Sequence, residues 1–447
     1  MAIRIIKARD PLASRAVARL RDALRGGGLT TSAKGGGRES VERTVKAILR
    51  KVASGGDREL VRLAKRYDKA VLTPKTLRVP PAAIGAAADA AEPKFLALAR
   101  RVIANIREYQ EHILIRPPAP LLRGGRELGV RYTPVDSVGV YVPGGRAVYP
   151  STMLMTIVPA RVAGVRRIAI ASPPNTAGEV NPMVLALAGE LGIGEVYRLG
   201  GAGAIAALAM GTESISPVDK IVGPGNAYVT EAKRQVFGRV GIDSTAGPSE
   251  VLIIADSAAD ARQVAADLLA QAEHDPGSAI LVTPSEKLAQ AVAAEVKRQL
   301  PALARFAAIR ACLRAYGAII VVADLPAACA AANEFAPEHL QIITSDDRSC
   351  LGMIRNAGAI FLGADTPVPL GDYYAGPSHV LPTGGTARFF GPLSCNDFMK
   401  ASSVLGYDAA ALAGDADDVI DFATREGLSA HAAAIDIRRK AGLLEDC

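Results

Sequence analysis

Beyond residue 137, short runs of β-branched residues alternate with Ala- and Leu-rich helical stretches, and this alternation limits the possible folds more than any other pattern. The runs are SVGVYV, RRIAIAS, EVYRL and DKIVG, followed by EVLIIAD, AILVT, GAIIVVAD, LQIIT and AIFLG. Strands separated by helices of this length are typical of parallel sheets that are covered on both faces. The runs form two sets, which predicts an α/β protein with two domains that have parallel-rich sheets.

Composition narrows the class of protein further. With 447 residues, 49% hydrophobic and 22% charged, the chain is long enough for about three globular units and is not disordered over most of its length. The net charge of +7 is spread along the sequence and Trp is absent, so we expect no nucleic-acid partner. No run of 18 apolar residues lacks a charge or a polar break, so we expect no membrane span.

The number and spacing of the cysteines and the sequence of the N-terminal segment indicate the cellular compartment. The chain has 5 cysteines and no C-x-x-C pair, which argues against a disulfide framework and against a zinc site built from thiolates. The segment MAIRIIKARDPL places Arg4, Lys7, Arg9 and Asp10 among its apolar residues, so a signal-peptide core cannot form there. We therefore expect reduced thiols and a cytoplasmic protein.

Several side chains suited to a divalent metal ion recur along the chain. Gln271 and His274 are three residues apart near the end of an expected helix, where such side chains share a face. Asp372 follows in an irregular Gly/Pro loop, and Glu426 and His431 lie in the tail. Two imidazoles with oxygen donors and no thiolate suit Zn²⁺ or a similar ion. For an isolated Gln–His pair, a histidine that caps the helix end is an equally good interpretation.

An acid/base pair, Glu338-His339, directly precedes an expected strand, and Pro337 disfavours helix in the residue before it. An imidazole with a pKa near 6.5 is a natural general base for an alcohol, and a neighbouring carboxylate can activate water. The pair therefore suits two successive proton abstractions. A structural ion pair beside a half-buried histidine is the commoner alternative for such a dipeptide.

Three Gly-rich turns could hold a cofactor: VPGGRA, LGGAGAIAALA and VGPGNAYVTEA. The second turn follows an expected strand and matches the dinucleotide pattern G-x-G-x-x-A through Gly201, Gly203 and Ala206. The third turn contains Asn226 and precedes a helix, whose free N–H groups favour a phosphate. An ordinary tight turn is the alternative for each of them.

Seven segments, in this order from about Val41 to the tail, together resemble histidinol dehydrogenase: VGVYVPGGRAVYPSTMLM, GPGNAYVTEAKRQVFG, GIDSTAGPSEVLIIAD, DLLAQAEHDP, EFAPEHLQI, LGDYYAGPSHVLPTGG and EGLSAHAAA. The resemblance implies an NAD- and zinc-dependent four-electron oxidation of L-histidinol, through L-histidinal, to L-histidine, the last steps of histidine biosynthesis. It also implies a homodimer with shared active sites. A paralogous zinc/NAD dehydrogenase for another polar alcohol is the alternative, and a zinc hydrolase or a non-catalytic nucleotide-binding module is less compatible with these segments.

The resemblance also implies roles for individual residues. The implied ligands of one Zn²⁺ per subunit are Gln271, His274, Asp372 and His431. The implied catalytic pair is Glu338 and His339. The implied substrate contacts are Ser249, His379 and Glu426, together with His339 and the four ligands. The implied NAD contacts are Tyr141, Asn226 and position 203, where this chain has Gly and the family usually has Gln. Loss of that one hydrogen bond would cost about 1 kcal/mol of cofactor affinity.

These patterns together predict two Rossmann-like domains with a small helical segment at the N-terminus and a helical tail. The expected division is residues 1–35 for the N-terminal helical segment and linker, 36–138 with 250–392 for the domain that carries the metal and catalytic residues, 139–249 for the NAD-binding domain, and 393–447 for the tail. Because such a tail is too small for its own core, we expect it to pack on another surface, and the resemblance implies that this surface belongs to the partner subunit.

Overall fold

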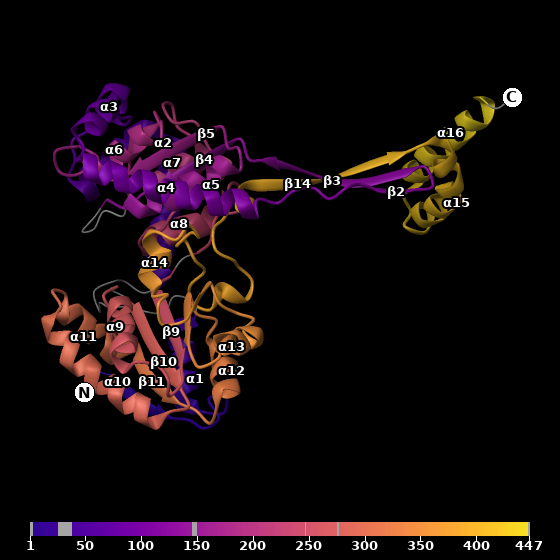
Figure 1. The fold of residues 1–447 in the computed structure, drawn as a ribbon. Helices are drawn as coiled ribbons and strands as arrows, with labels where there is room; N and C mark the ends of the chain where they lie inside the picture. The colour runs from indigo at the N-terminus through magenta and orange to yellow at the C-terminus, as the bar shows by residue number, and fades with distance from the viewer. Residues whose placement is uncertain (1–2, 26–37, 145–149, 246, 275–276, 446–447) are drawn as a thin grey trace. The chain divides into compact units, whose positions relative to one another are not determined.

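The computed structural model describes residues 3–25, 38–144, 150–245, 247–274 and 277–445, which form two compact units (Figure 1). The first unit comprises Met1–Ile113 and Asp136–Phe398, and the second comprises Leu114–Val135 and Met399–Cys447. The first unit contains two α/β lobes. We call residues 38–113 with 136–242 the first lobe, and residues 3–25 with 249–373 the second lobe.

The first lobe is built on a parallel five-stranded sheet with the order β6-β5-β4-β7-β8. The strands are β4 (Ser137–Tyr141), β5 (Arg167–Ser172), β6 (Val196–Arg198), β7 (Lys220–Val222) and β8 (Gly241–Ile242). Every residue of the central strand β4 is buried, as expected for a parallel sheet with helices on both faces. The strand order reverses direction between β4 and β7, and ligands bind at such a point in open α/β sheets.

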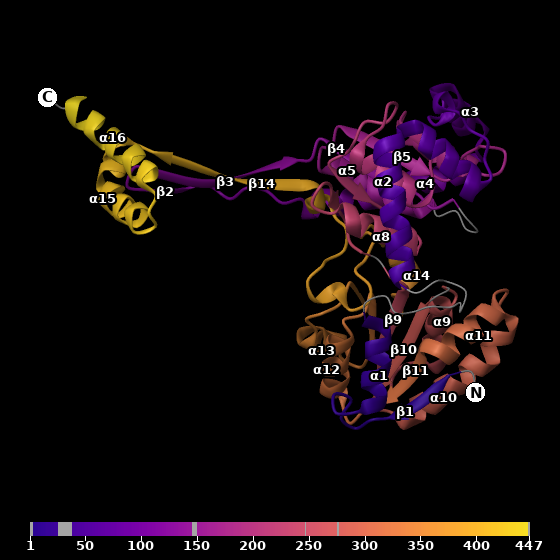
Figure 2. The ribbon, with the colours of Figure 1, turned by 180° about the vertical axis from the view of Figure 1, so that it is seen from behind.

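Some helices of the first lobe precede the strands of its sheet in the sequence, and the others lie between those strands. They are α2 (Arg38–Leu63), α3 (Pro81–Ala90), α4 (Pro93–Ile113), α5 (Pro150–Val162), α6 (Pro182–Glu190), α7 (Gly201–Met210) and α8 (Ala227–Val236). We expected residues 36–138 to share a domain with residues 250–392, but the structure divides the chain differently. The apolar stripe of α2, with Val45 and Leu60, shares a core with Ile205 of α7 and Val229 of α8, so α2 belongs to the first lobe (Figure 2).

The second lobe is built on a parallel six-stranded sheet with the order β1-β11-β10-β9-β12-β13. The strands are β1 (Arg4–Lys7), β9 (Ser249–Ala255), β10 (Gly277–Thr283), β11 (Gly317–Val321), β12 (His339–Ile343) and β13 (Ala359–Leu362). One face is covered by α9 (Ala261–Ala272), α10 (Glu286–Gln299) and α11 (Phe306–Tyr316), and the other by α1 (Arg15–Leu24), α12 (Leu325–Phe335) and α13 (Asp347–Met353).

The N-terminal segment is a second departure from the expected division. Residues 1–35 were expected to form a separate helical segment, but Arg4–Lys7 extend the second sheet by pairing in parallel with β11. Helix α1 then places Val17, Leu20 and Leu24 in the core of the second lobe. Residues 3–25 are therefore an integral part of this lobe, because β1 pairs with an edge of its sheet and α1 covers a face of it.

The second unit contains an antiparallel sheet with the order β14-β3-β2 and two helices. The elements are β2 (Leu121–Arg123), β3 (Arg126–Pro134), β14 (Met399–Tyr407), α15 (Ala409–Arg425) and α16 (Ser429–Glu445). The tail was expected to be helical throughout residues 393–447, but it begins with a strand, because MKASSVLGY pairs with β3 along its whole length. Two helices then follow, as expected.

The fold class expected from the sequence is confirmed, because each of the quoted β-branched runs contains a strand of one of the two parallel sheets. Among the described residues, no helix combines the length and the apolar character that a membrane span requires.

Candidate active site

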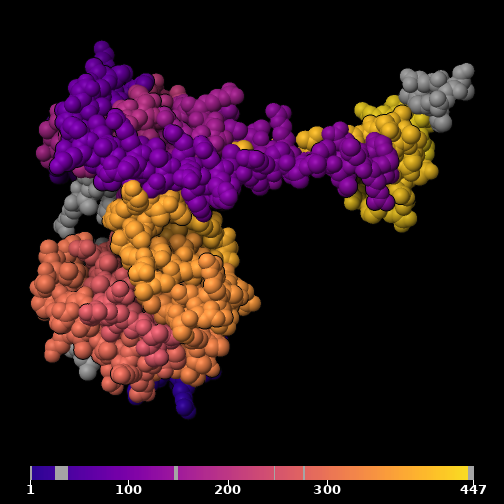
Figure 3. Space-filling model, in the orientation of Figure 1, coloured from indigo at the N-terminus to yellow at the C-terminus, as the bar shows by residue number. Residues whose placement is uncertain are grey.

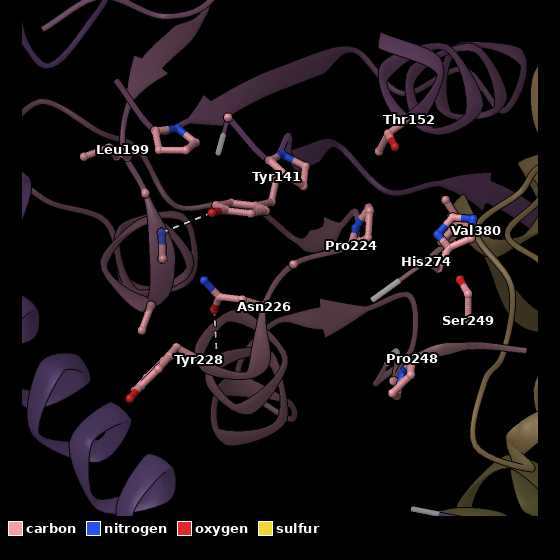
Figure 4. Close-up of a pocket in the computed structure, with 18 of the residues that line it drawn as sticks. Tyr141, Thr152, Leu199, Pro224, Asn226, Tyr228, Pro248, Ser249, His274 and Val380 are labelled. Atoms are coloured by element: carbon pink, nitrogen blue, oxygen red, sulfur yellow. Dashed lines mark hydrogen bonds between the residues drawn. The ribbon is translucent and has the colours of Figure 1, made fainter. Parts of the chain in front are cut away.

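A cavity of about 1630 Å³ in the first unit is lined by residues of both lobes. Figure 4 shows Tyr141, Asn226 and Tyr228 toward one end of it, and Ser249 and His274 toward the other. The first-lobe residues lie at the carboxyl ends of its strands, whereas Ser249 and His339 begin strands of the second lobe. The cavity therefore joins the reversal point of the first sheet to the amino ends of the second.

Several residues between Asp372 and Thr383, which follow the last strand of the second sheet, form a third part of the cavity wall. Ser378 donates a hydrogen bond to the carbonyl of Met155 in the first lobe, and the Gly384 amide donates to Glu250 Oε1 in the second lobe. In the space-filling view, the orange segment near residue 380 lies against both lobes (Figure 3). This segment brings His379 and Asp372 into the cavity wall.

Glu338 and His339 are held rigidly at the start of β12. Helix α12 ends at Ala336, which adopts a left-handed conformation (φ 49°) and is fully buried, and Pro337 follows. The Glu250 amide donates to Glu338 Oε2 at 2.8 Å, and His339 Nδ1 donates to the Glu250 carbonyl at 3.0 Å. The neutral imidazole therefore carries its proton on Nδ1, which leaves the lone pair of Nε2 free to accept a proton.

The surroundings shift the pKa values of both groups. Burial raises the pKa of Glu338 to about 7, so this carboxylate is a much stronger base than an exposed glutamate. Burial lowers the pKa of His339, but the carboxylates of Glu338 and Asp372 outweigh that effect and raise it to about 9. His339 Nε2 is buried without a hydrogen-bond partner and lies 3.4 Å from Asp372 Oδ1. With a pKa of about 9, His339 also holds a proton on Nε2 at neutral pH, so it accepts a proton from a ligand only after this proton has left, whereas Glu338 can exchange a proton near pH 7.

Glu250 is a functional neighbour that the sequence analysis missed. Its side chain is buried beside Glu338, and burial together with the charge of Glu338 raises the pKa of Glu250 to about 8. Glu250 is therefore the harder of the two carboxyl groups to ionise at neutral pH. A glutamate at the second position of the otherwise apolar run SEVLIIA was the signal that could have revealed it.

Gln271, His274 and Asp372 are the expected metal ligands of the first unit. Gln271 is buried in the last turn of α9 and its Nε2 has no hydrogen-bond partner, whereas His274 and Asp372 line the cavity. Asp372 was expected in an irregular loop, but it lies in the short helix α14 (Val368–Tyr373), because Pro367 and Pro369 suit a helix N-terminus. In the described ranges, no three His, Cys, Asp or Glu side chains form a complete metal-binding group.

The protonation states of these groups fit a metal ion. Burial lowers the pKa of His274, which keeps the imidazole neutral at neutral pH. Burial raises the pKa of Asp372, but the interaction with His339, and the charges of His379 and His274, lower it below its usual value. A neutral imidazole and an ionised carboxylate are the forms that bind a metal ion.

Ser249 and His379 lie near the catalytic pair, as expected. Ser249 lines the cavity together with Glu338, and His379 Nδ1 donates to the Asp372 carbonyl at 2.8 Å. His379 Nε2 lies 3.3 Å from the hydroxyl of Thr152, a buried residue of α5 that the sequence analysis did not single out. Thr152 therefore ties the first lobe to the wall that carries Asp372.

Tyr141 and Asn226 form the opposite end of the cavity. The Tyr141 hydroxyl accepts a hydrogen bond from the Gly201 amide at the start of α7. Asn226 caps α8, because its Oδ1 accepts hydrogen bonds from the amides of Tyr228 and Val229. Both side chains are thus fixed beside helix N-termini, where an anionic group of a ligand is favoured.

Gly203 lines the cavity but also faces α2. A Cβ atom at this position would lie 2.9 Å from Leu63 Cδ1 and 3.7 Å from Leu60 Cδ2. Glycine therefore allows the close packing of α7 on α2, and a glutamine would have to displace the Leu63 side chain. This packing gives a structural reason for glycine at a position where the resemblance led us to expect glutamine.

A buried ion pair, Lys233–Asp243, supports the turn that carries Asn226. Lys233 Nζ donates to the Gly223 carbonyl, and Asp243 Oδ2 accepts from the Gly223 amide. Gly223 has φ 110°, and a Cβ there would lie 2.2 Å from the Tyr141 carbonyl oxygen. The pair therefore fixes the Gly-rich turn against β4.

We expect Lys233→Met to reduce the free energy of unfolding by about 3 kcal/mol, because Asp243 would stay buried without its counter-ion. Lys7→Met is the matched control, since the Lys7–Glu286 pair is exposed and should contribute under about 1 kcal/mol. Urea unfolding followed by circular dichroism measures both changes. Equal effects of the two variants would contradict the structural role of the buried pair.

Glu426 and His431 lie in the second unit. Glu426 is the residue at which α15 ends, and His431 lies in the first turn of α16. Both side chains are exposed. Of the residues expected to form the site, the structure brings nine together in one cavity: Tyr141, Gly203, Asn226, Ser249, His274, Glu338, His339, Asp372 and His379.

Comparison with known proteins identifies relatives of the chain. The family profile described as histidinol dehydrogenase matches residues 32–439. The histidinol dehydrogenase of Rhodopirellula baltica is 49% identical over 98% of this chain and 97% of its own length. That of Halalkalibacterium halodurans is 50% identical over 90% of this chain and 95% of its own. A crystal structure of histidinol dehydrogenase from Elizabethkingia anophelis superposes with a TM-score of 0.90, at 31% identity over 98% of both chains.

Proposed function

We propose that this chain, which belongs to the histidinol dehydrogenase family and is an oxidoreductase, uses NAD and zinc to oxidise L-histidinol through L-histidinal to L-histidine. The observation that carries the proposal is the composition of a single cavity. It contains a buried acid/base pair and two metal-type ligands at one end, and two residues fixed at helix N-termini at the other. We further propose that the enzyme works in the cytoplasm.

The donor set suits zinc. Gln271, His274 and Asp372 would hold the ion together with His431 of the partner subunit, and their oxygen and imidazole donors match a borderline divalent cation. When bound, zinc supplies a Lewis acid that orients the nitrogen-containing substrate. Ser249, His379 and the partner subunit's Glu426 would complete the substrate contacts.

The chain's own residues would perform the proton transfers. His339 takes the proton of the substrate hydroxyl on Nε2, because Nδ1 is fixed by the Glu250 carbonyl. Glu338 takes a proton from the water that attacks the aldehyde carbon, and its raised pKa makes it basic enough for this step. When bound, NAD would supply the hydride acceptor for both oxidations. Tyr141 and Asn226 would position it at the other end of the cavity, beside Gly203.

The second unit supports a homodimer with shared sites. Leu405, Phe422 and Ile437 expose about 70% of their surface in the single chain (69%, 71% and 68%), and a partner subunit would cover such side chains. His431 and Glu426 lie in this same unit. We propose that, on contact with a second copy, their side chains complete the partner's cavity.

A mixture of His274→Asn and His431→Asn subunits should regain about one quarter of the wild-type activity after random reassembly, because half of the sites in each heterodimer contain both histidines. Each variant alone should be inactive. Different affinity tags on the two variants allow heterodimers to be purified and assayed for NADH formation. Inactive, correctly assembled heterodimers would show that each site uses its own His431.

Substrate specificity tests the proposed reaction itself. The wild-type enzyme should form NADH with L-histidinol, and at most about one hundredth as fast with amino alcohols that lack the imidazole, because those cannot occupy the same ligand positions. NADH absorbance with a panel of such alcohols measures this ratio. Equal kcat/KM for an amino alcohol without an imidazole would favour the paralogous dehydrogenase instead.

A further inference from the structure

Asp68 places an unpaired carboxylate at the end of the cavity opposite to His339. It is the last residue of the π-helical turn Ala64–Asp68 that extends α2, and it lines the cavity. A Cβ atom on Gly200 would lie 3.0 and 3.3 Å from its two carboxylate oxygens, so the carboxylate lies against the start of α7. Within the described ranges, no hydrogen bond or ion pair of this side chain is found.

The surroundings of Asp68 favour the binding of a ligand group to its carboxylate. Burial alone raises the pKa of Asp68 to about 6, so the folded chain holds a carboxylate where it is poorly solvated and gains no partner for it. The carboxylate does not cap α7 either, because the Gly201 amide donates to the Tyr141 hydroxyl instead. A carboxylate accepts hydrogen bonds through two oxygens, so a ligand group with two adjacent hydroxyls would satisfy it.

The neighbours of Asp68 fit an adenosine and disfavour an additional phosphate. Tyr67 lines the same cavity with an exposed ring that can stack on a base. Among the described residues that line the cavity, Arg305 is the sole lysine or arginine, and it belongs to the second lobe. A phosphate on the ribose would therefore meet the negative charge of Asp68; the nearby guanidinium of Arg66, which lies 5.2 Å from the centroid of the Tyr67 ring, does not line the cavity.

We propose that Asp68 binds the 2′- and 3′-hydroxyls of the adenosine ribose and thereby makes the enzyme select NAD over NADP. This inference rests on the proposed binding of a dinucleotide in the cavity. Asp68 is a specificity-determining residue here, because its two oxygens match the diol and its charge repels a 2′-phosphate. It does not take part in the proton transfers, which occur at Glu338 and His339.

Equilibrium titration of the zinc-loaded enzyme with NADH and with NADPH, followed by nucleotide fluorescence, tests the inference without relying on turnover. Asp68→Asn should weaken NADH binding roughly tenfold and leave NADPH binding equal or stronger, so that the preference for NADH falls by at least about tenfold. Asp89→Asn removes the same charge from an exposed site in α3 and should keep the wild-type preference. Circular dichroism and thermal unfolding verify that each variant is folded.

An unchanged ratio of NADH to NADPH affinity in folded Asp68→Asn would overturn the role of Asp68, even though the wild type binds NADH. Equal loss of affinity for both nucleotides would also overturn it, because it would indicate a structural effect without discrimination at the ribose. Failure of the wild-type enzyme to bind either nucleotide is a different result. It would overturn the proposed dinucleotide site itself.

Discussion

His339→Asn is expected to lower kcat for the oxidation of histidinol by about 10³-fold, because asparagine cannot accept the hydroxyl proton. The side chain is buried, its Nδ1 is occupied by the Glu250 carbonyl, and its Nε2 has no hydrogen-bond partner. Asparagine retains a donor for the Glu250 carbonyl, so the backbone at the start of β12 should stay in place. Stopped-flow measurement of NADH formation from histidinol gives the rate of the first oxidation.

Three controls separate proton transfer from loss of structure. The zinc content of His339→Asn should stay near wild type, since the expected metal ligands are other residues. His112→Asn, a change in an exposed histidine of α4, should leave kcat unchanged. A wild-type rate for His339→Asn would rule out His339 as the base, and loss of zinc in this variant would assign it to the metal site.

Glu338→Gln is expected to lower the rate of oxidation of supplied histidinal by about 10³-fold, because the amide cannot take a proton from the attacking water. The two side chains have nearly the same shape, and glutamine can still accept the hydrogen bond from the Glu250 amide. The first oxidation of histidinol should be much less affected. A single-turnover experiment should therefore show a first burst of NADH without the second phase.

Glu334→Gln provides a matched control for this charge change. Glu334 lies in the last turn of α12, four residues before Glu338, but its carboxylate pairs with Arg21, Arg25 and Arg388 at the surface. Both oxidation rates of Glu334→Gln should stay within about twofold of wild type. If Glu338→Gln oxidised histidinal as fast as wild type, another group would have to activate the water.

The parallel strands could be predicted from sequence because strands buried on both faces appear as uninterrupted apolar runs, as in EVLIIAD and GAIIVVAD. The strands that escaped prediction lack this property. In β1 only two apolar residues lie between charges, and β14 is mostly exposed. The lobe on which α2 packs could not be predicted either, because an apolar stripe does not specify which sheet it will cover.

The site was predictable where several chemical groups are adjacent in sequence, as in Glu338-His339. It was not predictable where one ordinary residue gains its importance from tertiary packing. Thr152 meets His379 only because the two lobes approach each other, and Glu250 meets Glu338 only because β9 and β12 are neighbours. Asp68 is a further example, because only the fold places its carboxylate beside Gly200 at the start of α7.

The stoichiometry of complete oxidation tests the central claim most directly. With limiting L-histidinol and excess NAD, we expect two molecules of NADH and one of L-histidine per histidinol, without released aldehyde. Chelation should abolish this reaction, and added zinc should restore it. One NADH per histidinol with free histidinal in solution, or full activity of enzyme shown to be free of metal, would contradict the account.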